Sequence, residues 1–474
     1  MNTAQLFTII VNKFLAQAPL LLGTIAFIGY ILLGRKIYEA LSGFIKAYVG
    51  FRILQVATGG IVGVFRPILQ ALRSTFGIDG YVIDPYSALP SAIEGLDAIN
   101  GASFVGYTML IAFAINILLV LFRKVTKIRT LMITGHVMYI QSAVLLYGLH
   151  CALVGIDVKV GMYVTVITGI ILGLYWSVFS NLTVEASNHV TGGAGFAIGH
   201  QQMLGDWLAY KLGKYFGKPE DSVDDVKLPG WLSMFNDNVV SNTLVMTAFI
   251  GIIMLIIGKD AFEYNTGKFT WGTYIFYQTA SFPVYVTILL TGVRMFVAEL
   301  TASFEGISNK ILPGSVPAVD CAVIFGFAPG AVTYGFIFGL LGQLVAIGIL
   351  ILIKSPVLIL TGFIPVFFDN ATIAVYANKS GGKRAAAIMP FCSGLVQVFG
   401  SAIVLSLGYY SLGFMGSFDW AAMWSPLVYF SKMMGIVAPG IAIVVMLVIP
   451  QLQYRRYKNK DNYFTVMMDE KCEA

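Results

Sequence analysis

Long apolar segments alternate with short polar ones along most of the chain. Each apolar segment is long enough to cross the hydrocarbon core of a bilayer, about 30 Å, as a helix. They lie near residues 14–34, 44–65, 102–122, 131–154, 160–180, 239–258, 273–298, 331–353, 357–378, 385–407 and 427–449. The pattern predicts an all-α polytopic membrane protein with about eleven transmembrane helices.

Three segments are apolar but interrupted, at residues 69–100, 185–218 and 301–330. Glycine, proline and amide side chains recur in them, and irregular backbone at membrane depth is tolerated only where protein covers it or where it lines a cavity. We therefore expect re-entrant hairpins there. The acidic, amphipathic stretch 219–235 predicts a cytoplasmic interfacial helix, with a solvated linker as the alternative.

Two pairs of segments resemble each other in the same order along the chain. Residues 50–54 (GFRIL) match 292–296 (GVRMF), and residues 131–137 (LMITGHV) match 358–364 (LILTGFI). Each copy follows its partner by about five predicted spans, and an odd number of spans inverts the copy, as in many secondary transporters. We expect two inverted-topology repeats with hairpins, at 1–218 and 239–450, joined by a cytoplasmic linker at 219–238 and followed by a cytoplasmic tail at 451–474.

Composition and charge support this interpretation. Hydrophobic residues make up 57% of the 474 residues and charged residues 11%, against about 25% charged in soluble domains. Basic residues gather between spans, at Arg35 and Lys36 and near 123–129, 379–384 and 455–460. This distribution predicts a periplasmic N-terminus and a cytoplasmic C-terminus, although Arg66 and Arg73 count against it. A nucleic-acid partner is not expected, because no continuous basic face is indicated.

Enzyme motifs are not found. The sequence has no phosphate-binding loop, no zinc-protease motif and no hydrolase nucleophile elbow. Its four histidines and four cysteines are spread apart, so we expect no metal, no cofactor and no catalytic residue.

Polar residues within apolar spans are costly and mark candidate binding sites. His136 and Gln141 lie in the fourth span, where a bond to a neighbouring helix is as good an explanation as ligand contact. His200 and Gln201, with Gln202, follow a glycine-rich run and suit recognition of hydroxyl or lactone groups. Asp320 is either a hydrogen-bond acceptor for substrate hydroxyls or the cap of a half-helix.

Two further observations bear on the site and on its energy source. Thr58, in the second span, either contacts substrate or belongs to a small-residue helix contact. Carboxylates deep in the spans are few, with Asp320 and Asp369 as exceptions. This scarcity weakens ion coupling without excluding it.

Several segments, distributed in order over nearly the whole chain, resemble one known family. They are 18–36 (APLLLGTIAFIGYILLGRK), 129–141 (RTLMITGHVMYIQ), 195–202 (GFAIGHQQ), 226–232 (VKLPGWL), 292–300 (GVRMFVAEL), 319–332 (VDCAVIFGFAPGAV) and 362–378 (GFIPVFFDNATIAVYAN). The family is the ascorbate-specific permease, component C, of the bacterial phosphoenolpyruvate-dependent sugar phosphotransferase system. The tail after about residue 450 lies outside the resemblance.

The resemblance implies a homodimeric permease of the bacterial inner membrane, in which a substrate-holding core moves against a scaffold. It implies group translocation: L-ascorbate enters from the periplasm and is released as L-ascorbate 6-phosphate, with phosphate donated by a phosphocysteine of a separate cytoplasmic component B. The implied substrate contacts are Thr58, Tyr86, His136, His200, Gln201 and Asp320.

One position departs from the family pattern. The family's fourth-span motif has two consecutive amides, whereas here Ile140 precedes Gln141, which we add as a candidate contact. The main alternative hypothesis is a proton- or sodium-coupled transporter of a sugar acid or polyol. A membrane-embedded enzyme is a third hypothesis with less support.

Overall fold

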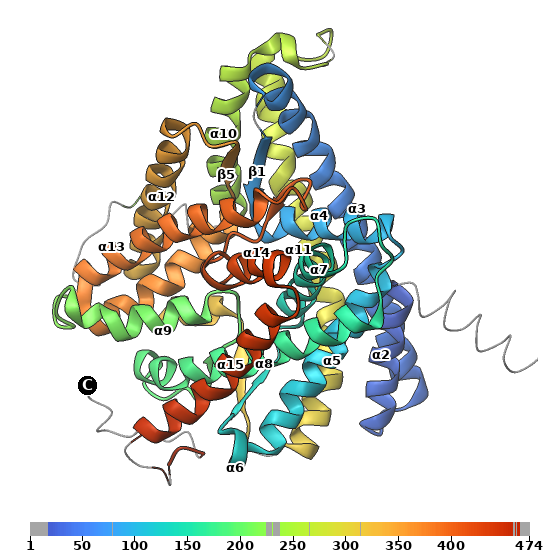
Figure 1. Cartoon of the computed structure of the whole chain (residues 1–474), viewed down its shortest axis with the longest axis vertical. Helices are drawn as coiled ribbons and strands as arrows, with labels where there is room; N and C mark the ends of the chain where they lie inside the picture. Colours follow the sequence, from blue (N-terminus) through green and yellow to red (C-terminus); the bar gives the residue numbers. More distant parts are fainter. Residues whose placement is uncertain are drawn as a thin grey trace, which may run out of the picture.

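The computed structural model describes residues 18–77, 79–223, 230, 238–264, 266–312, 314–457, 460 and 462–464. Most of the linker expected at 219–238 and the last residues of the tail lie outside this part, so the predicted interfacial helix keeps the standing of a prediction. Helices dominate the described residues, as Figure 1 shows, and the predicted helical membrane architecture is confirmed in this respect.

The helices are α2 (Ala18–Leu32), α3 (Ile37–Phe76), α4 (Pro85–Ala98), α5 (Ala102–Leu121), α6 (Arg123–Thr126), α7 (Gly135–Leu153), α8 (Met162–Thr191), α9 (Met203–Leu212), α10 (Asn238–Ile257), α11 (Trp271–Ile311), α12 (Pro329–Leu352), α13 (Asn370–Leu405), α14 (Ser425–Met434) and α15 (Val437–Arg456). Short 3₁₀ or π segments are η2 (Gly213–Tyr215), η5 (Lys259–Ala261), η6 (Cys321–Phe327), η7 (Pro365–Asp369) and η8 (Trp420–Trp424). The strands are β1 (Asp79–Ile83), β2 (Thr130–Met132), β3 (Ala197–Ile198), β4 (Val316–Val319), β5 (Val357–Thr361) and β6 (Gly413–Phe414).

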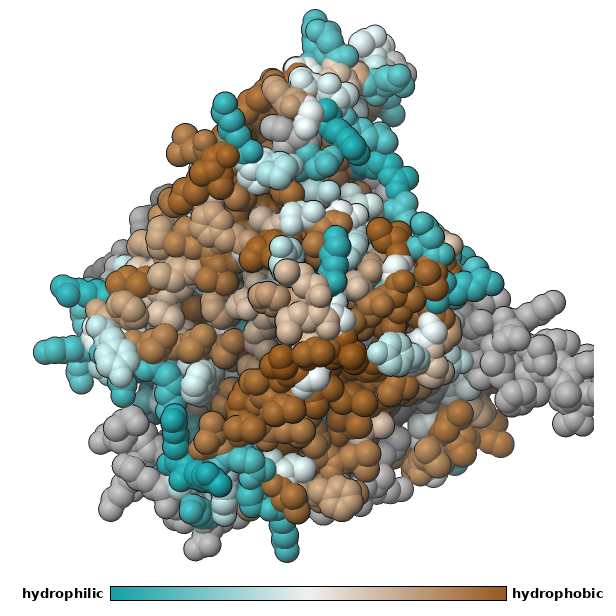
Figure 2. Space-filling view, in the orientation of Figure 1, coloured by the Kyte–Doolittle hydropathy of each residue, from teal (hydrophilic) through white to brown (hydrophobic). Residues whose placement is uncertain are grey.

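The chain is a multi-pass membrane protein. Within the described residues, seven helices are long and apolar enough to cross a bilayer, among them α7, α8 and α15. Figure 2 shows a broad hydrophobic area on the face where α15 lies, and many of the apolar side chains of α15 are exposed there, as expected of a helix in contact with lipid. The count of eleven crossings stays a prediction.

Two of the predicted spans, 357–378 and 385–407, lie largely in one interrupted element. Strand β5 and the π segment η7 precede α13, and Gly382 interrupts α13 with a φ of 65°. A Cβ atom at Gly382 would collide with the carbonyl oxygens of Lys218 and Asp221. Glycine is therefore required at this kink both for its backbone angle and for the close approach.

The long helices form two packed groups. Helix α3 packs against α11, with α2 and α10 beside this pair. In the second group α12 packs along α13, and α5 along α8.

Two three-stranded parallel sheets lie where the helices are interrupted. Their strand orders are β5-β1-β6 and β2-β4-β3. The central strand β1 comes from the first half of the chain and its neighbours from the second, while β4 comes from the second half and its neighbours from the first. The two halves of the chain therefore complete each other's sheets.

The sheets add strands to the three segments expected to form re-entrant hairpins, and the hairpins themselves stay a prediction. Residues 69–100 contain the end of α3, β1 and α4; residues 185–218 contain the end of α8, β3, α9 and η2; and residues 301–330 contain the end of α11, β4 and η6. The strands were not predicted, because two to five apolar residues inside an apolar segment show no period of two. The strands satisfy backbone groups that the interrupted helices leave open.

We predict that Gly413→Ala destabilises the fold. Gly413 pairs with Val82 in the β1·β6 ladder, and a Cβ atom at Gly413 would overlap the Val82 carbonyl oxygen. We expect the free energy of unfolding to fall by about 1–3 kcal/mol, as in other overpacked sites. Gly440→Ala is the control, because no atom lies within 4 Å of a Cβ atom there. Equal melting temperatures for the two variants in detergent would contradict this account.

Candidate functional site

Three polar side chains converge at one edge of the β2-β4-β3 sheet. His136 is the second residue of α7 and comes shortly after β2. Asp320 is the first residue after β4, and His200 is the second residue after β3. Parallel strands end at the same edge of a sheet, and ligands of open parallel sheets bind at the carboxyl ends of their strands. The short sheet thus gathers residues that are far apart in the sequence.

The three side chains form a half-open cluster. The Nε2 atom of His136 lies 3.3 Å from Oδ2 of Asp320, and the two imidazole rings lie 6.5 Å apart, edge to face. Asp320 also caps η6, because its Oδ1 accepts the amide N–H of Ala322 at 3.0 Å. The side chains of His136 and Asp320 are 22% and 35% exposed, while His200 is buried. A ligand can reach the first two directly.

Gln202 orients His200. Its Oε1 lies 2.8 Å from Nδ1 of His200, and its Nε2 donates to the hydroxyl of Thr372 at 3.1 Å. The same Oε1 accepts the Gln201 amide N–H at 3.0 Å. Since an amide oxygen only accepts, Nδ1 of His200 carries the proton, and in the neutral ring Nε2 keeps its lone pair for a ligand.

The two candidate amides differ in their availability. The Oε1 atom of Gln201 is buried and has no hydrogen-bond partner among the described residues, so it can accept a bond from a ligand. Gln141 has both ends engaged: its Nε2 donates to the His200 carbonyl at 3.3 Å, and its Oε1 accepts the indole N–H of Trp176 at 2.6 Å. Gln141 therefore supports the backbone of His200.

Two other predicted contacts are not part of the described cluster. Tyr86 stands in the first turn of α4, after β1, and so belongs to the other sheet. Thr58 lies within α3, but its side chain falls outside the described part of the structure.

The other sheet repeats the arrangement with different chemistry. Asp84 directly follows β1 and caps α4, since its Oδ1 accepts the Tyr86 amide N–H at 2.8 Å. Its Oδ2 accepts the backbone N–H of Ile364, after β5, at 3.0 Å. At the corresponding place in the candidate site, Oδ2 of Asp320 faces the His136 side chain instead. Asp84 is fully buried and fully bonded, which is a structural role.

Further buried carboxylates lie outside the cluster. Asp419 accepts bonds from the amides of Leu204 and Gly205 and from the hydroxyl of Tyr175, at 2.7–3.1 Å. Asp369 accepts the amide N–H of Phe418 at 3.1 Å. Both hold the ends of interrupted segments. Asp369 was noted in the sequence, whereas Asp419 was missed, because a single aspartate between two predicted spans gives no signal.

The cluster offers acceptors and donors for a small polar solute rich in hydroxyl groups. Its ligand atoms also lie within 4.8 Å of one another, and two imidazoles with a carboxylate are ligands that transition metals accept. The sequence spacing argued against such a site, whereas the sheet brings the three residues together.

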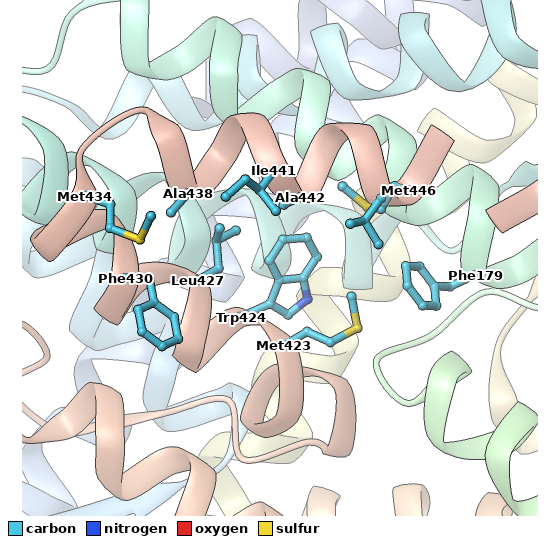
Figure 3. A pocket seen from close by; sticks show the side chains of 11 residues that line it. Phe179, Met423, Trp424, Leu427, Phe430, Met434, Ala438, Ile441, Ala442 and Met446 are labelled. Carbon is cyan, nitrogen blue, oxygen red and sulfur yellow. The ribbon is translucent and has the colours of Figure 1, made fainter. Parts of the chain in front are cut away.

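A separate cavity of about 390 Å³ lies between α14 and α15 (Figure 3). Its walls are apolar side chains, including Phe179, Leu427 and Met446, with Trp424 at the centre of the view. A cavity with this lining does not suit a polar solute, and it holds none of the predicted site residues.

Comparison with known proteins assigns the family. Residues 13–425 match the family model of the PTS system sugar-specific permease component, EIIC-GAT. A relative from Mycoplasma pneumoniae, the "Ascorbate-specific PTS system EIIC component", is 34% identical over 428 residues, which cover 82% of this chain and 64% of the relative. The chain therefore spans somewhat less than two thirds of that relative's length. The chain belongs to the EIIC-GAT family of sugar-specific permease components, and the resemblance seen in the sequence is confirmed.

We predict that Gln202→Leu frees the His200 ring from its fixed tautomer. The substitution removes the acceptor of Nδ1–H and the bond to Thr372, at a cost of about 1–3 kcal/mol in the free energy of unfolding. In ¹⁵N-histidine spectra, wild-type His200 should show the Nδ1–H form and the variant a mixture. Gln451→Leu, on the half-buried Gln451 in α15, is the control. A protonated Nε2 in the neutral wild-type ring would contradict the assignment.

Proposed function

We propose that this permease component carries L-ascorbate across the bacterial inner membrane and releases it as L-ascorbate 6-phosphate. The phosphate comes from a phosphocysteine of a cytoplasmic component B acting in trans. The observation that carries the proposal is the cluster of His136, His200 and Asp320. Gln201 follows His200 in the chain, and its Oε1 has no hydrogen-bond partner among the described residues. The name of the Mycoplasma pneumoniae relative supports the choice of substrate.

The chemistry of the cluster fits ascorbate. Ascorbate is a monoanion with several hydroxyl groups, and it needs acceptors for the hydroxyls and positive potential for the charge. Asp320, Gln201 Oε1 and Nε2 of neutral His200 supply acceptors. His136 faces Asp320 at 3.3 Å, and the N-terminus of α7, where His136 lies, contributes positive potential.

The proposed coupling follows from membership in the phosphotransferase permease family. In this scheme the component binds and exposes the substrate, while the phosphocysteine on component B supplies the phosphoryl group. Phosphorylation gives the product a charged group that keeps it in the cytoplasm, so no ion gradient is needed. The permease itself then needs no cofactor and no catalytic residue.

We further propose an architecture of two inverted repeats, at 1–218 and 239–450, in a homodimer with a periplasmic N-terminus and a cytoplasmic C-terminus. The exchange of central strands between the two sheets supports the repeats, since β1 and β4 occupy equivalent places. The like placement of Asp84 and Asp320 supports them as well.

We predict that His200→Ala and Asp320→Ala abolish uptake at sub-saturating ascorbate while the protein remains folded and inserted. Loss of a hydrogen bond to a charged group costs about 1.5–3 kcal/mol, which weakens binding about 10- to 100-fold. Labelled ascorbate uptake in whole cells and binding to purified protein measure the effect. His189→Ala and Asp97→Ala, at exposed positions, are matched controls. Near-normal uptake by both site variants would remove these residues from the substrate pocket.

We predict that ascorbate accumulation requires the phosphorelay. Cells that express the permease but lack component B should accumulate no labelled ascorbate, and a protonophore should not directly affect cells with an intact relay over short times. Accumulation that survives loss of the relay and collapses with a protonophore or on sodium removal would instead establish the ion-coupled transporter. Product analysis for ascorbate 6-phosphate completes the test.

A further inference from the structure

A tyrosine of the C-terminal tail is completely buried. Tyr463 lies beyond α15 and beyond the residues that match the family model, yet it is 0% exposed. Its hydroxyl donates to the Lys127 carbonyl at 2.8 Å and accepts from Nδ2 of Asn181 at 3.0 Å. Burial raises the pKa of Tyr463, so the hydroxyl stays protonated and able to donate. The tail is thus anchored by specific contacts.

The ring of Tyr463 packs on a buried arginine. The guanidinium carbon of Arg129 lies 3.8 Å from the ring centroid, and Nη1 donates to the Tyr463 carbonyl at 3.0 Å. Nη2 of Arg129 pairs with Glu185 on α8 at 2.6 Å. With its charge paired and its face stacked, Arg129 is held on both sides. We call the contacts of Tyr463 with Lys127, Arg129 and Asn181 the C-terminal clamp.

The clamp leads directly to the strands of the substrate site. Arg129 is the residue before β2, and its carbonyl accepts the amide N–H of Val316, the first residue of β4, at 2.8 Å. Strand β2 leads to His136 and strand β4 leads to Asp320. One residue therefore binds the tail through its side chain and the strand pair through its backbone.

The end of α15 has its own attachment. Nε2 of Gln453 donates to the Asn181 carbonyl at 2.9 Å and to Glu185 at 3.0 Å. Helix α15 also packs along α8 (Figure 1). The Tyr463 ring also packs edge to face on Tyr454 of α15, at 5.0 Å between ring centroids, but the Gln453 bonds do not depend on that ring. Removal of the Tyr463 ring should therefore leave α15 in place and loosen Arg129 and the strand that follows it.

We propose that Tyr463 is a positioning residue for the substrate site: docked in the C-terminal clamp, it holds the β2·β4 strand pair so that His136 and Asp320 face each other. The choice of ascorbate as ligand rests on the proposed function, whereas the clamp itself does not. Tyr463, which lies beyond the family match, is then part of the binding apparatus.

The test compares Tyr463→Ala with Tyr463→Phe in the full chain, reconstituted in lipid nanodiscs. Phenylalanine keeps the ring on the guanidinium but loses the two hydroxyl bonds. We expect Tyr463→Ala to raise the ascorbate Kd about 3- to 10-fold and Tyr463→Phe to stay closer to wild type. Tyr215→Ala is the control for the loss of a tyrosine ring, because Tyr215 is exposed in η2 and its ring meets the ammonium group of Lys214 at 5.6 Å, away from the clamp.

A double-mutant cycle separates positioning from general destabilisation. In a His136→Gln background, Tyr463→Ala should cause little further loss of affinity, because both changes act on the same pair. Additive losses would show that the clamp acts only on overall stability. A wild-type Kd in Tyr463→Ala, at equal melting temperature, would overturn the proposal outright.

Hydrogen exchange tests the clamp without any substrate. In Tyr463→Ala, amides of 130–132 and 316–319 should exchange faster, while those of 79–83 and 357–361 in the other sheet should not change. If the wild-type protein binds no ascorbate, the proposed function fails. The exchange pattern still shows whether Tyr463 holds β2 and β4 in place. Unchanged exchange in β2 and β4, or equal acceleration in both sheets, would refute it.

Discussion

The whole structure depends on one constraint, that every backbone hydrogen-bonding group at membrane depth must find a partner within the protein. Helices meet this constraint along their length but not where they are interrupted. Here the interruptions are paired with one another as two short parallel sheets, each completed by a strand from the other half of the chain. Neither half can therefore satisfy its own backbone alone. The polar site is a consequence of this strand pairing, because His136 and Asp320 lie where the strands end and the next helical segments begin.

Two aspartates show how one local device serves two purposes. Asp84 and Asp320 each end a central strand and cap the segment that follows, with nearly the same bond lengths of 2.8 and 3.0 Å. The second oxygen of Asp84 accepts the backbone N–H of Ile364, so both oxygens of this carboxylate are bonded to backbone and its role is structural. The second oxygen of Asp320 faces an imidazole, which can exchange partners with a ligand. The two aspartates therefore differ in the partner of Oδ2: a backbone N–H gives Asp84 a structural role, whereas a side chain leaves Asp320 available to a ligand.

Around the site, supporting residues decide which groups are free. Gln202 and Thr372 fix the His200 ring, and Trp176 and Gln141 hold its backbone. Among the described residues, the Oε1 atom of Gln201 has no hydrogen-bond partner. These supporting bonds explain why glutamines of the same chemistry have different roles. Gln141 is bonded at both ends of its amide and cannot readily bond a ligand. An amide oxygen without a partner, as in Gln201, costs free energy in a low-dielectric interior until a ligand bonds it. The tail residue Tyr463 belongs to the same system at a greater distance, through Arg129.

The sequence by itself determined the membrane class, the positions of most helices and the interrupted segments, because apolar length and polar interruption are local properties. It also singled out His136, His200, Gln201 and Asp320 as candidates. It also carried the family resemblance. It did not reveal the strands, which are too short to show a period, or the supporting roles of Gln141 and Gln202, or the burial of Tyr463. Only the tertiary structure decided these, because they depend on which distant segments meet. The convergence of His136, His200 and Asp320 at one sheet edge arises from pairing between halves of the chain, and no local pattern encodes a partner almost two hundred residues away.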